Sequence, residues 1–190
     1  MTDIDIDFAD PEAALHGVQH VRATLRETRQ KHNTAVYFHD IPVDPLDGMA
    51  VWDHKEAARR GFFKIDFLHN TIYHDIRDEA HLQRLLDTEP PWEAFEDRLV
   101  VEQLTQIGNH FATVRTIQPK CIEDLAVCVA IIRKGKKHLI GRSRQEIDQE
   151  IWQPLPPSDE PDYMYKRPHA LAYAASIVVQ LNLMLEQINE

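Results

Sequence analysis

Four aspartates in this sequence could hold a divalent cation. Asp3, Asp5 and Asp7 alternate with apolar residues near the start, and Asp66 lies inside a later apolar stretch. Side chains alternate between the two faces of a β-strand, so the first three carboxylates share one face if residues 3–8 are a strand. Carboxylates this close repel one another, and a bound cation relieves that repulsion. Oxygen ligands without histidine or cysteine nearby in sequence favour Mg²⁺ or Mn²⁺ over Zn²⁺.

These aspartates have a simpler alternative interpretation, which their spacing alone favours. In that interpretation the three carboxylates form only the solvent-exposed face of an edge strand. If metals do bind, two ions about 3.5–4 Å apart would hold the attacking and leaving oxygens of a phosphoryl transfer.

A second candidate site is the basic segment 133–144, which contains no acidic residue. The chain as a whole carries a net charge of −10, which disfavours a free-standing nucleic-acid-binding protein. The charge is unevenly distributed, however, and phosphate could bind at this segment. Lys134, Lys136 and Lys137 could equally serve only to stabilise a helix end, whereas a functional role is favoured for Arg133. Its basic residues are Arg133, Lys134, Lys136, Lys137, Arg142 and Arg144.

The elements that must position these residues follow from hydrophobic patterning and from proline and glycine. Strands are predicted over residues 3–8, 34–39 and 62–67. Helices are predicted over about 11–31, 55–60, 70–87, 91–114, 121–134, 143–152 and 168–188. The sequence therefore predicts an α+β protein, with a small three-stranded sheet in residues 1–68 and a mostly helical region in residues 69–190.

The sequence shows no sign of membrane insertion or export. No apolar run approaches the ~20 residues that cross a bilayer, and the first residues lack the basic and apolar regions of a signal peptide. We therefore expect a soluble, cytoplasmic protein.

Residues 2–8 and residues 61–68 each contain a short motif that resembles one in the alpha subunit of bacterial DNA polymerase III, a family C replicative polymerase. Residues 2–8 resemble its Pro-Asp-x-Asp-x-Asp-Phe motif, and residues 61–68 resemble its Gly-Leu-x-Lys-x-Asp-Phe-Leu motif. In that family, the first two aspartates of the first motif and the aspartate of the second hold the catalytic metals. The matching positions here are Asp3, Asp5 and Asp66.

Two further motifs are similar to the fingers of the same family. Residues 119–135 resemble a segment in which Glu-Asp-Leu leads to Ala-Leu-x-Arg-Pro-Gly, and Arg133 takes the place of its arginine. Residues 165–174 resemble Phe-Asn-Lys-Ser-His-Ala-x-Ala-Tyr-Ala, with Arg167 in place of the lysine and His169 matching the histidine. The four motifs follow the family's order along the chain.

The departures from the family pattern predict a partner. The sequence begins at the first aspartate motif, so it lacks the upstream segment, rich in glycine and serine, that cradles the triphosphate in the family. The thumb domain that the family inserts after this motif is also missing, and Lys134 replaces a proline of the fingers. We therefore expect a second polymerase chain to supply the missing part of the palm.

The resemblance implies a palm and fingers fragment of a DNA-directed DNA polymerase, a nucleotidyltransferase that uses two Mg²⁺ or Mn²⁺ ions. Asp3 and Asp5 would bridge the metals, and Asp66 would orient the one on the primer side. The expected partners are primer-template DNA, a deoxynucleoside triphosphate and the second polymerase chain. Contacts with the triphosphate are expected from Arg133, Lys134, Lys136, Lys137, Arg167 and His169.

Two alternatives remain open at this stage. The chain could be a non-catalytic polymerase-like subunit that binds or scaffolds a replication complex, with the aspartates retained only as a strand pattern. A weaker alternative is an acidic protein that mimics DNA, which the basic segment 133–144 disfavours.

Overall fold

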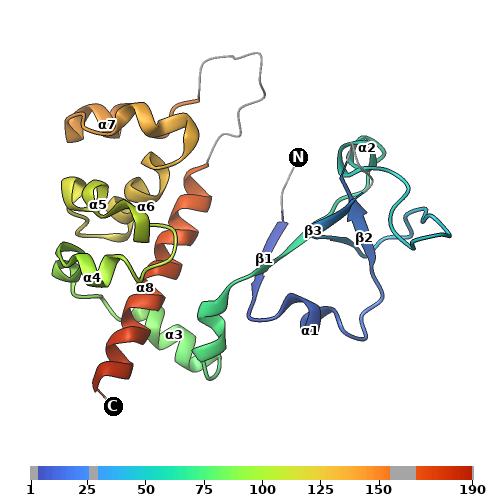
Figure 1. Ribbon diagram of the computed structural model, residues 1–190, viewed down its shortest axis with the longest axis horizontal. Coiled ribbons are helices and arrows are strands. Elements are labelled where there is room, and N and C mark those ends of the chain that lie inside the picture. Colours follow the sequence, from blue (N-terminus) through green and yellow to red (C-terminus); the bar gives the residue numbers. More distant parts are fainter. Residues whose placement is uncertain (1–3, 26–29, 155–165, 190) are drawn as a thin grey trace. The chain divides into compact units, whose positions relative to one another are not determined.

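The computed structural model describes residues 4–25, 30–154 and 166–189 (Figure 1). The chain forms two compact units, Met1–Asp75 and Ile76–Glu190, which we call the sheet unit and the helical unit and describe separately. The sequence-based prediction placed the division after residue 68. The mixed α+β class that the sequence predicts is confirmed, with helices in both units and a sheet in the first.

The described part of the sheet unit contains a four-stranded mixed sheet, one strand more than predicted. The strand order is β1-β4-β3-β2. Strand β1 runs parallel to β4, whereas β3 is antiparallel to both β4 and β2. The three predicted strands correspond to β1, β3 and β4. The strands are β1 (Ile4–Phe8), β2 (Val21–Thr24), β3 (Lys31–Tyr37) and β4 (Ile65–His69).

The long helix predicted over residues 11–31 is wrong. Helix α1 covers only Pro11–Leu15, and β2 follows it. Asp10 caps the start of α1, because its side chain accepts the backbone N–H groups of the first turn. Gly17 then adopts a φ of 77°, a left-handed conformation that glycine adopts readily and that takes the chain out of the helix.

One face of the sheet packs against α1. Leu15 of the helix is buried with Val36 and Phe67 of the sheet, and Phe8 packs against this cluster. The rings of Phe8 and Phe67 stack with centroids 4.7 Å apart. This small apolar layer fixes β1 to β4.

The other face is covered by the chain between β3 and β4, which includes helix α2 (His54–Arg59). Asp53 caps α2 by accepting two backbone N–H groups. Ala35 belongs to this second cluster and pairs across the sheet with Asp66, so Asp66 lies on the same face. The buried apolar residues of this layer are Ala23, Ala35, Tyr37, Ile41, Ala50 and Ala57.

In the helical unit, short helices surround one buried helix. After its first turn, helix α6 is apolar on every side, and all its residues from Leu125 to Ile131 are buried, which is typical of a helix at the centre of a core. Helix α8 packs along it, and Ala174, Ile177 and Leu181 join the same core. The α-helices are α3 (Glu79–Asp87), α4 (Arg98–Val101), α5 (Phe111–Ile117), α6 (Ile122–Ile131), α7 (Arg144–Glu150) and α8 (Arg167–Asn189). The 3₁₀ helices are η1 (Thr71–Asp75), which belongs to the sheet unit, η2 (Trp92–Glu96), η3 (Gly108–His110) and η4 (Lys134–Leu139).

The prediction of one helix over residues 91–114 is also wrong, because the chain breaks there into η2, α4, η3 and the start of α5. Asp97 ends η2 and caps α4 by accepting the N–H of Leu99. Gln106 has a φ of 64°. A Cβ on Gly108 would lie 2.9 Å from the carbonyl oxygen of Glu102, so the chain folds back closely at this glycine.

The remaining predicted helices are found with shifted ends. The segment 70–87 divides into η1 and α3, because Asp78 caps a new helix there. Residues 55–60, 121–134, 143–152 and 168–188 correspond to α2, α6, α7 and α8. Ser143 and Glu146 form a capping box that starts α7.

Helix α8 is the one described helix that is long and apolar enough to cross a bilayer. Residues Arg167–Ile188 have a mean hydropathy of 1.3 over the best window, and 39% of that window is buried within the unit. A core helix gives the same signature, and α8 packs against α6. Cytoplasmic localisation stays a prediction.

Candidate functional site

Asp5 and Asp66 are direct neighbours on adjacent parallel strands. The register of β1 and β4 pairs Asp5 with Asp66 and Asp7 with Leu68. Laterally paired residues point to the same face, and neighbouring strands lie about 4.8 Å apart. The two carboxylates can therefore reach one small cation. Asp3, the third predicted ligand, lies outside the described residues.

The carboxylate of Asp66 is buried and held in place by its neighbours. Asp66 is only 6% exposed, whereas Asp5 is exposed. The hydroxyl of Thr34 donates to Oδ1 of Asp66 over 2.6 Å, and the ammonium of Lys64 pairs with Oδ2. These contacts fix the orientation of the carboxylate, as a metal ligand or a buried ion pair requires.

Lys64 and Asp66 form an ion pair that is largely removed from water. Their side chains are 13% and 8% exposed. The ammonium neutralises the carboxylate, so a divalent cation at Asp66 would have to share Oδ2 with Lys64 or displace it.

His32 lies beside Asp66, and its contacts indicate a neutral ring. Its Nδ1 is 3.8 Å from Oδ1 of Asp66 and accepts the backbone N–H of Ala35 over 3.1 Å. Burial is the main reason that the pKa of His32 is lowered. The charge of Asp66 raises this pKa, whereas the charges of Lys64 and His54 lower it. With Nδ1 occupied as an acceptor, the proton of the neutral ring is on Nε2.

Tyr37 adds a buried phenol to the same face. Burial raises its pKa to about 12, and the charges of Asp53 and Asp66 act in the same direction. The hydroxyl has no hydrogen-bond partner among the residues that the structure describes. The sequence did not identify Thr34, His32 or Tyr37 as site residues. Their sequence signal is weak: they lie on or next to the strand predicted over residues 34–39.

Asp5 and Asp66 together offer two carboxylates as ligands for a magnesium ion. Within the described ranges, no group of three or more His, Cys, Asp or Glu side chains is placed to hold a metal ion. Magnesium is commonly held by only one or two carboxylates and takes its other ligands from water and substrate phosphates. Two oxygen ligands from the protein are therefore sufficient for this ion if water or substrate phosphates complete its coordination.

The lysines of the basic segment have different environments in the helical unit. Lys136 is 5% exposed, and its ammonium donates to the carbonyl oxygens of Glu150 at 2.9 Å and Gln153 at 2.7 Å. It thus stabilises the end of α7, and burial lowers its pKa. Lys134 and Lys137 are exposed.

The arginines and the histidine of the predicted fingers motifs lie around the start of α8. Arg133 donates to the side chain of Gln106, and its guanidinium lies 6.0 Å from the centre of the Tyr173 ring. His169 is one helical turn before Tyr173. Arg167 lies 6.0 Å from the centre of the Trp152 ring. The structure therefore brings Arg133 close to α8, while Asp5 and Asp66 belong to the sheet unit.

Comparisons with protein-family models, curated proteins and solved structures found no match to this chain.

Proposed function

We propose that this chain is part of a DNA-directed DNA polymerase of the polymerase III alpha type, in which Asp5 and Asp66 hold Mg²⁺ for nucleotidyl transfer. The observation that carries the proposal is the register that places these two aspartates side by side on parallel strands. Each belongs to one of the two aspartate motifs that resemble the family, and the motifs are about sixty residues apart in the sequence.

The neighbouring side chains prepare Asp66 for this role. Thr34 fixes one carboxylate oxygen by its hydrogen bond, and Lys64 neutralises the carboxylate when no other cation is near. Bound Mg²⁺ would polarise the phosphate oxygens and favour ionisation of the attacking primer hydroxyl. Asp5 is exposed at the sheet edge, so substrate phosphates can approach it from solvent.

The position of β1 supports the proposal that a second chain completes the palm. This strand is at the edge of the described sheet, with β4 as its only neighbour. An edge strand has unpaired backbone groups on its outer side and can accept a strand from another polypeptide. An added strand would also hold Asp5 in place. Contacts of the fingers with the triphosphate are proposed for Arg133, Lys134, Lys137, Arg167 and His169, but not for the buried Lys136.

A second candidate function is a non-catalytic polymerase-like subunit that scaffolds a replication complex. The ion pair between Lys64 and Asp66 favours it, because a lysine that permanently neutralises the carboxylate would leave little affinity for a metal. The two candidates differ in whether Asp66 can exchange its lysine partner for a divalent cation.

Binding of Mn²⁺ to the full chain tests the metal site directly. Free Mn²⁺ is measured by electron paramagnetic resonance for the wild type, Asp5→Asn and Asp66→Asn. Each variant should weaken binding by at least about tenfold, since even an outer-shell partner of a metal is worth that much. Asp7→Asn is the matched control, because Asp7 lies on the same strand and face but pairs with Leu68. Equal binding by all four proteins, or none, contradicts the metal site.

Primer extension with Mg²⁺ tests the activity. The full chain is assayed alone and in the complex isolated from its source cells. We expect extension by the complex, and its loss with Asp5→Asn or Asp66→Asn. Extension that is unchanged by both substitutions would contradict a catalytic role and favour the scaffold function.

A further inference from the structure

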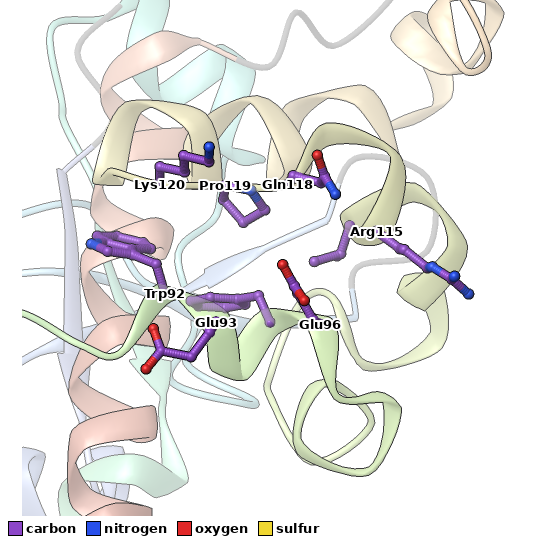
Figure 2. A pocket seen from close by; sticks show the side chains of 9 residues that line it. Trp92, Glu93, Glu96, Arg115, Gln118, Pro119 and Lys120 are labelled. Atoms are coloured by element: carbon purple, nitrogen blue, oxygen red, sulfur yellow. The ribbon is translucent and has the colours of Figure 1, made fainter.

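The helical unit contains a hollow of about 410 Å³ between η2 and the segment that joins α5 to α6 (Figure 2). Its size lies at the lower end of the range for small-molecule sites, about 300–1,000 Å³. None of the residues assigned above to metal or triphosphate binding lines it. Ligand binding in this hollow can therefore be tested independently of the proposed polymerase activity.

The walls of the hollow are flat and apolar. The rings of Trp92 and Phe95 have centroids 5.8 Å apart and planes only 23° from parallel. The indole N–H of Trp92 donates to Glu89 over 3.1 Å, which fixes the orientation of the ring. Pro119 lies across the hollow from Trp92 (Figure 2). A planar ligand can stack in such a slot, and stacking on an aromatic side chain is the usual way that proteins hold a nucleobase.

One carboxylate points into this slot. Figure 2 shows the carboxylate of Glu96 directed toward Gln118, whereas that of Glu93 points away from the centre of the hollow. Nowhere in the described chain does the Glu96 side chain have a hydrogen-bond or ion-pair partner. An ionised carboxylate only accepts hydrogen bonds, so Glu96 selects a ligand with donors at the edge of its ring.

Two cations lie at the rim of the same hollow. Arg115 and Lys120 line it, and within the described ranges neither side chain forms an ion pair. Both point outward from its centre (Figure 2). They would repel a cationic ligand such as an arginine side chain, which otherwise suits an aromatic wall with a carboxylate. They would attract a ligand that carries a phosphate on the side away from its ring.

We propose that this hollow binds the guanine base of a nucleotide. The base stacks on Trp92, and the carboxylate of Glu96 accepts hydrogen bonds from N1–H and from the 2-amino group. The phosphate lies beside Arg115 or Lys120. Guanine fits because its pairing edge presents two adjacent donors to one carboxylate, whereas adenine has a single donor group next to an acceptor. The nucleotide can be free or part of a single strand, since base and phosphate are common to both.

Calorimetric titration of the full chain with GMP tests the base contact. Glu96→Gln keeps the size of the side chain but removes its charge and one acceptor, and should weaken binding about tenfold to a hundredfold, the range of a good bidentate base contact. Glu93→Gln, which changes a glutamate of the same 3₁₀ helix that points away, should bind GMP like the wild type. Equal loss in both variants, or no loss in either, overturns the proposal.

Trp92→Leu tests the stacking contact. Leucine keeps an apolar side chain but has no flat face, so GMP binding should weaken by about tenfold or more. Circular dichroism checks that the helical unit remains folded. If the fold is lost, Trp92→Phe replaces this variant and should retain most of the binding. A folded Trp92→Leu variant that binds GMP like the wild type contradicts stacking.

Other ligands test whether the hollow selects guanine over the other bases and whether the guanine comes from a free nucleotide or from a single strand. AMP, CMP and UMP should bind more weakly than GMP, and equal binding of all four overturns the assignment to guanine. A thymine oligonucleotide with one central guanine, compared with one of thymine alone, tests the single strand. Tighter binding of the guanine oligonucleotide than of GMP identifies a strand as the source, and the reverse identifies a free nucleotide. Preference for an arginine-containing peptide over GMP contradicts the proposal.

Discussion

Asp66 in the sheet unit and Lys136 in the helical unit are both buried charged residues, but their charges are balanced in different ways. Asp66 is paired with the ammonium of Lys64 and lies beside Asp5, a second carboxylate on the next strand. Lys136 donates to two backbone carbonyl oxygens at the end of α7.

The difference separates a candidate site from a packing feature. The carboxylate of Asp66 is balanced by the side chain of Lys64 and lies next to another carboxylate, so under the proposed function a metal ion would replace this lysine. Carbonyl oxygens at a helix end are part of the fold, and a lysine bound to them is not available to a ligand. Burial alone therefore does not distinguish a candidate site from a packing feature here; the kind of partner does.

The largest effect on stability is expected from Asp66→Ala, which leaves the ammonium of Lys64 buried without its partner. Breaking a buried ion pair from one side costs about 3–5 kcal/mol. Urea denaturation measures the loss, followed by Trp52 fluorescence after Trp92 and Trp152 are replaced by phenylalanine. The double variant Lys64→Met with Asp66→Leu is the control and should lose much less. A loss below about 1 kcal/mol, typical of exposed pairs, would show that water screens this ion pair.

Leu125→Ala should be the next largest change, because it opens a cavity in the helical unit without changing any charge. Leu125 is fully buried in α6, and such truncations cost about 2–5 kcal/mol. Urea denaturation followed by circular dichroism measures it. Leu99→Ala, at a leucine that is 70% exposed in the same unit, should cost far less. Similar losses for the two variants would contradict the central position of α6.

Lys136→Met should destabilise the helical unit by about 1–3 kcal/mol, because the carbonyl oxygens of Glu150 and Gln153 lose a charged donor. Lys137→Met is the matched control and should change stability by no more than about 0.5 kcal/mol, as exposed substitutions usually do. The midpoints of urea denaturation of Lys136→Met and Lys137→Met are each compared with that of the wild type. If Lys137→Met proves as costly as Lys136→Met, the distinction between the buried and the exposed lysine fails.

The sheet unit illustrates what patterning can predict. Strict alternation of acidic and apolar residues predicted a strand at residues 3–8, and apolar runs predicted those at 34–39 and 62–67. Pairing of Asp5 with Asp66 does not follow from alternation, because the register depends on how Phe8 and Phe67 pack. The strand Val21–Thr24 was missed because its local sequence suits a helix, and pairing with β3 overrides that preference.

The basic segment illustrates what patterning cannot predict. Six cations in twelve residues identify a positively charged stretch, but nothing local distinguishes Lys136 from Lys137. The distinction depends on the end of α7, fourteen to seventeen residues further along the chain. The hollow beside Trp92 was missed for a similar reason, since its walls come from η2, α5 and the segment that follows α5.

Tyr37→Phe, in the sheet unit, should give the smallest change in stability at neutral pH. The hydroxyl of Tyr37 lacks a hydrogen-bond partner in the described part of the chain, so its removal should alter stability by less than about 1 kcal/mol. At alkaline pH the two proteins should diverge. The ordinary pKa of the phenol is 10.0, and the folded value is about 12.

The sign of that divergence follows from the two pKa values. Below pH 10 both states keep the phenolic proton. Between pH 10 and 12 the unfolded chain loses it while the folded protein retains it, so the stability of the wild type falls as the pH rises. The full difference amounts to about 3 kcal/mol at 1.36 kcal/mol for each pKa unit. Urea denaturation across this range should show a steeper fall for the wild type than for Tyr37→Phe, and parallel curves would place the phenol in contact with water.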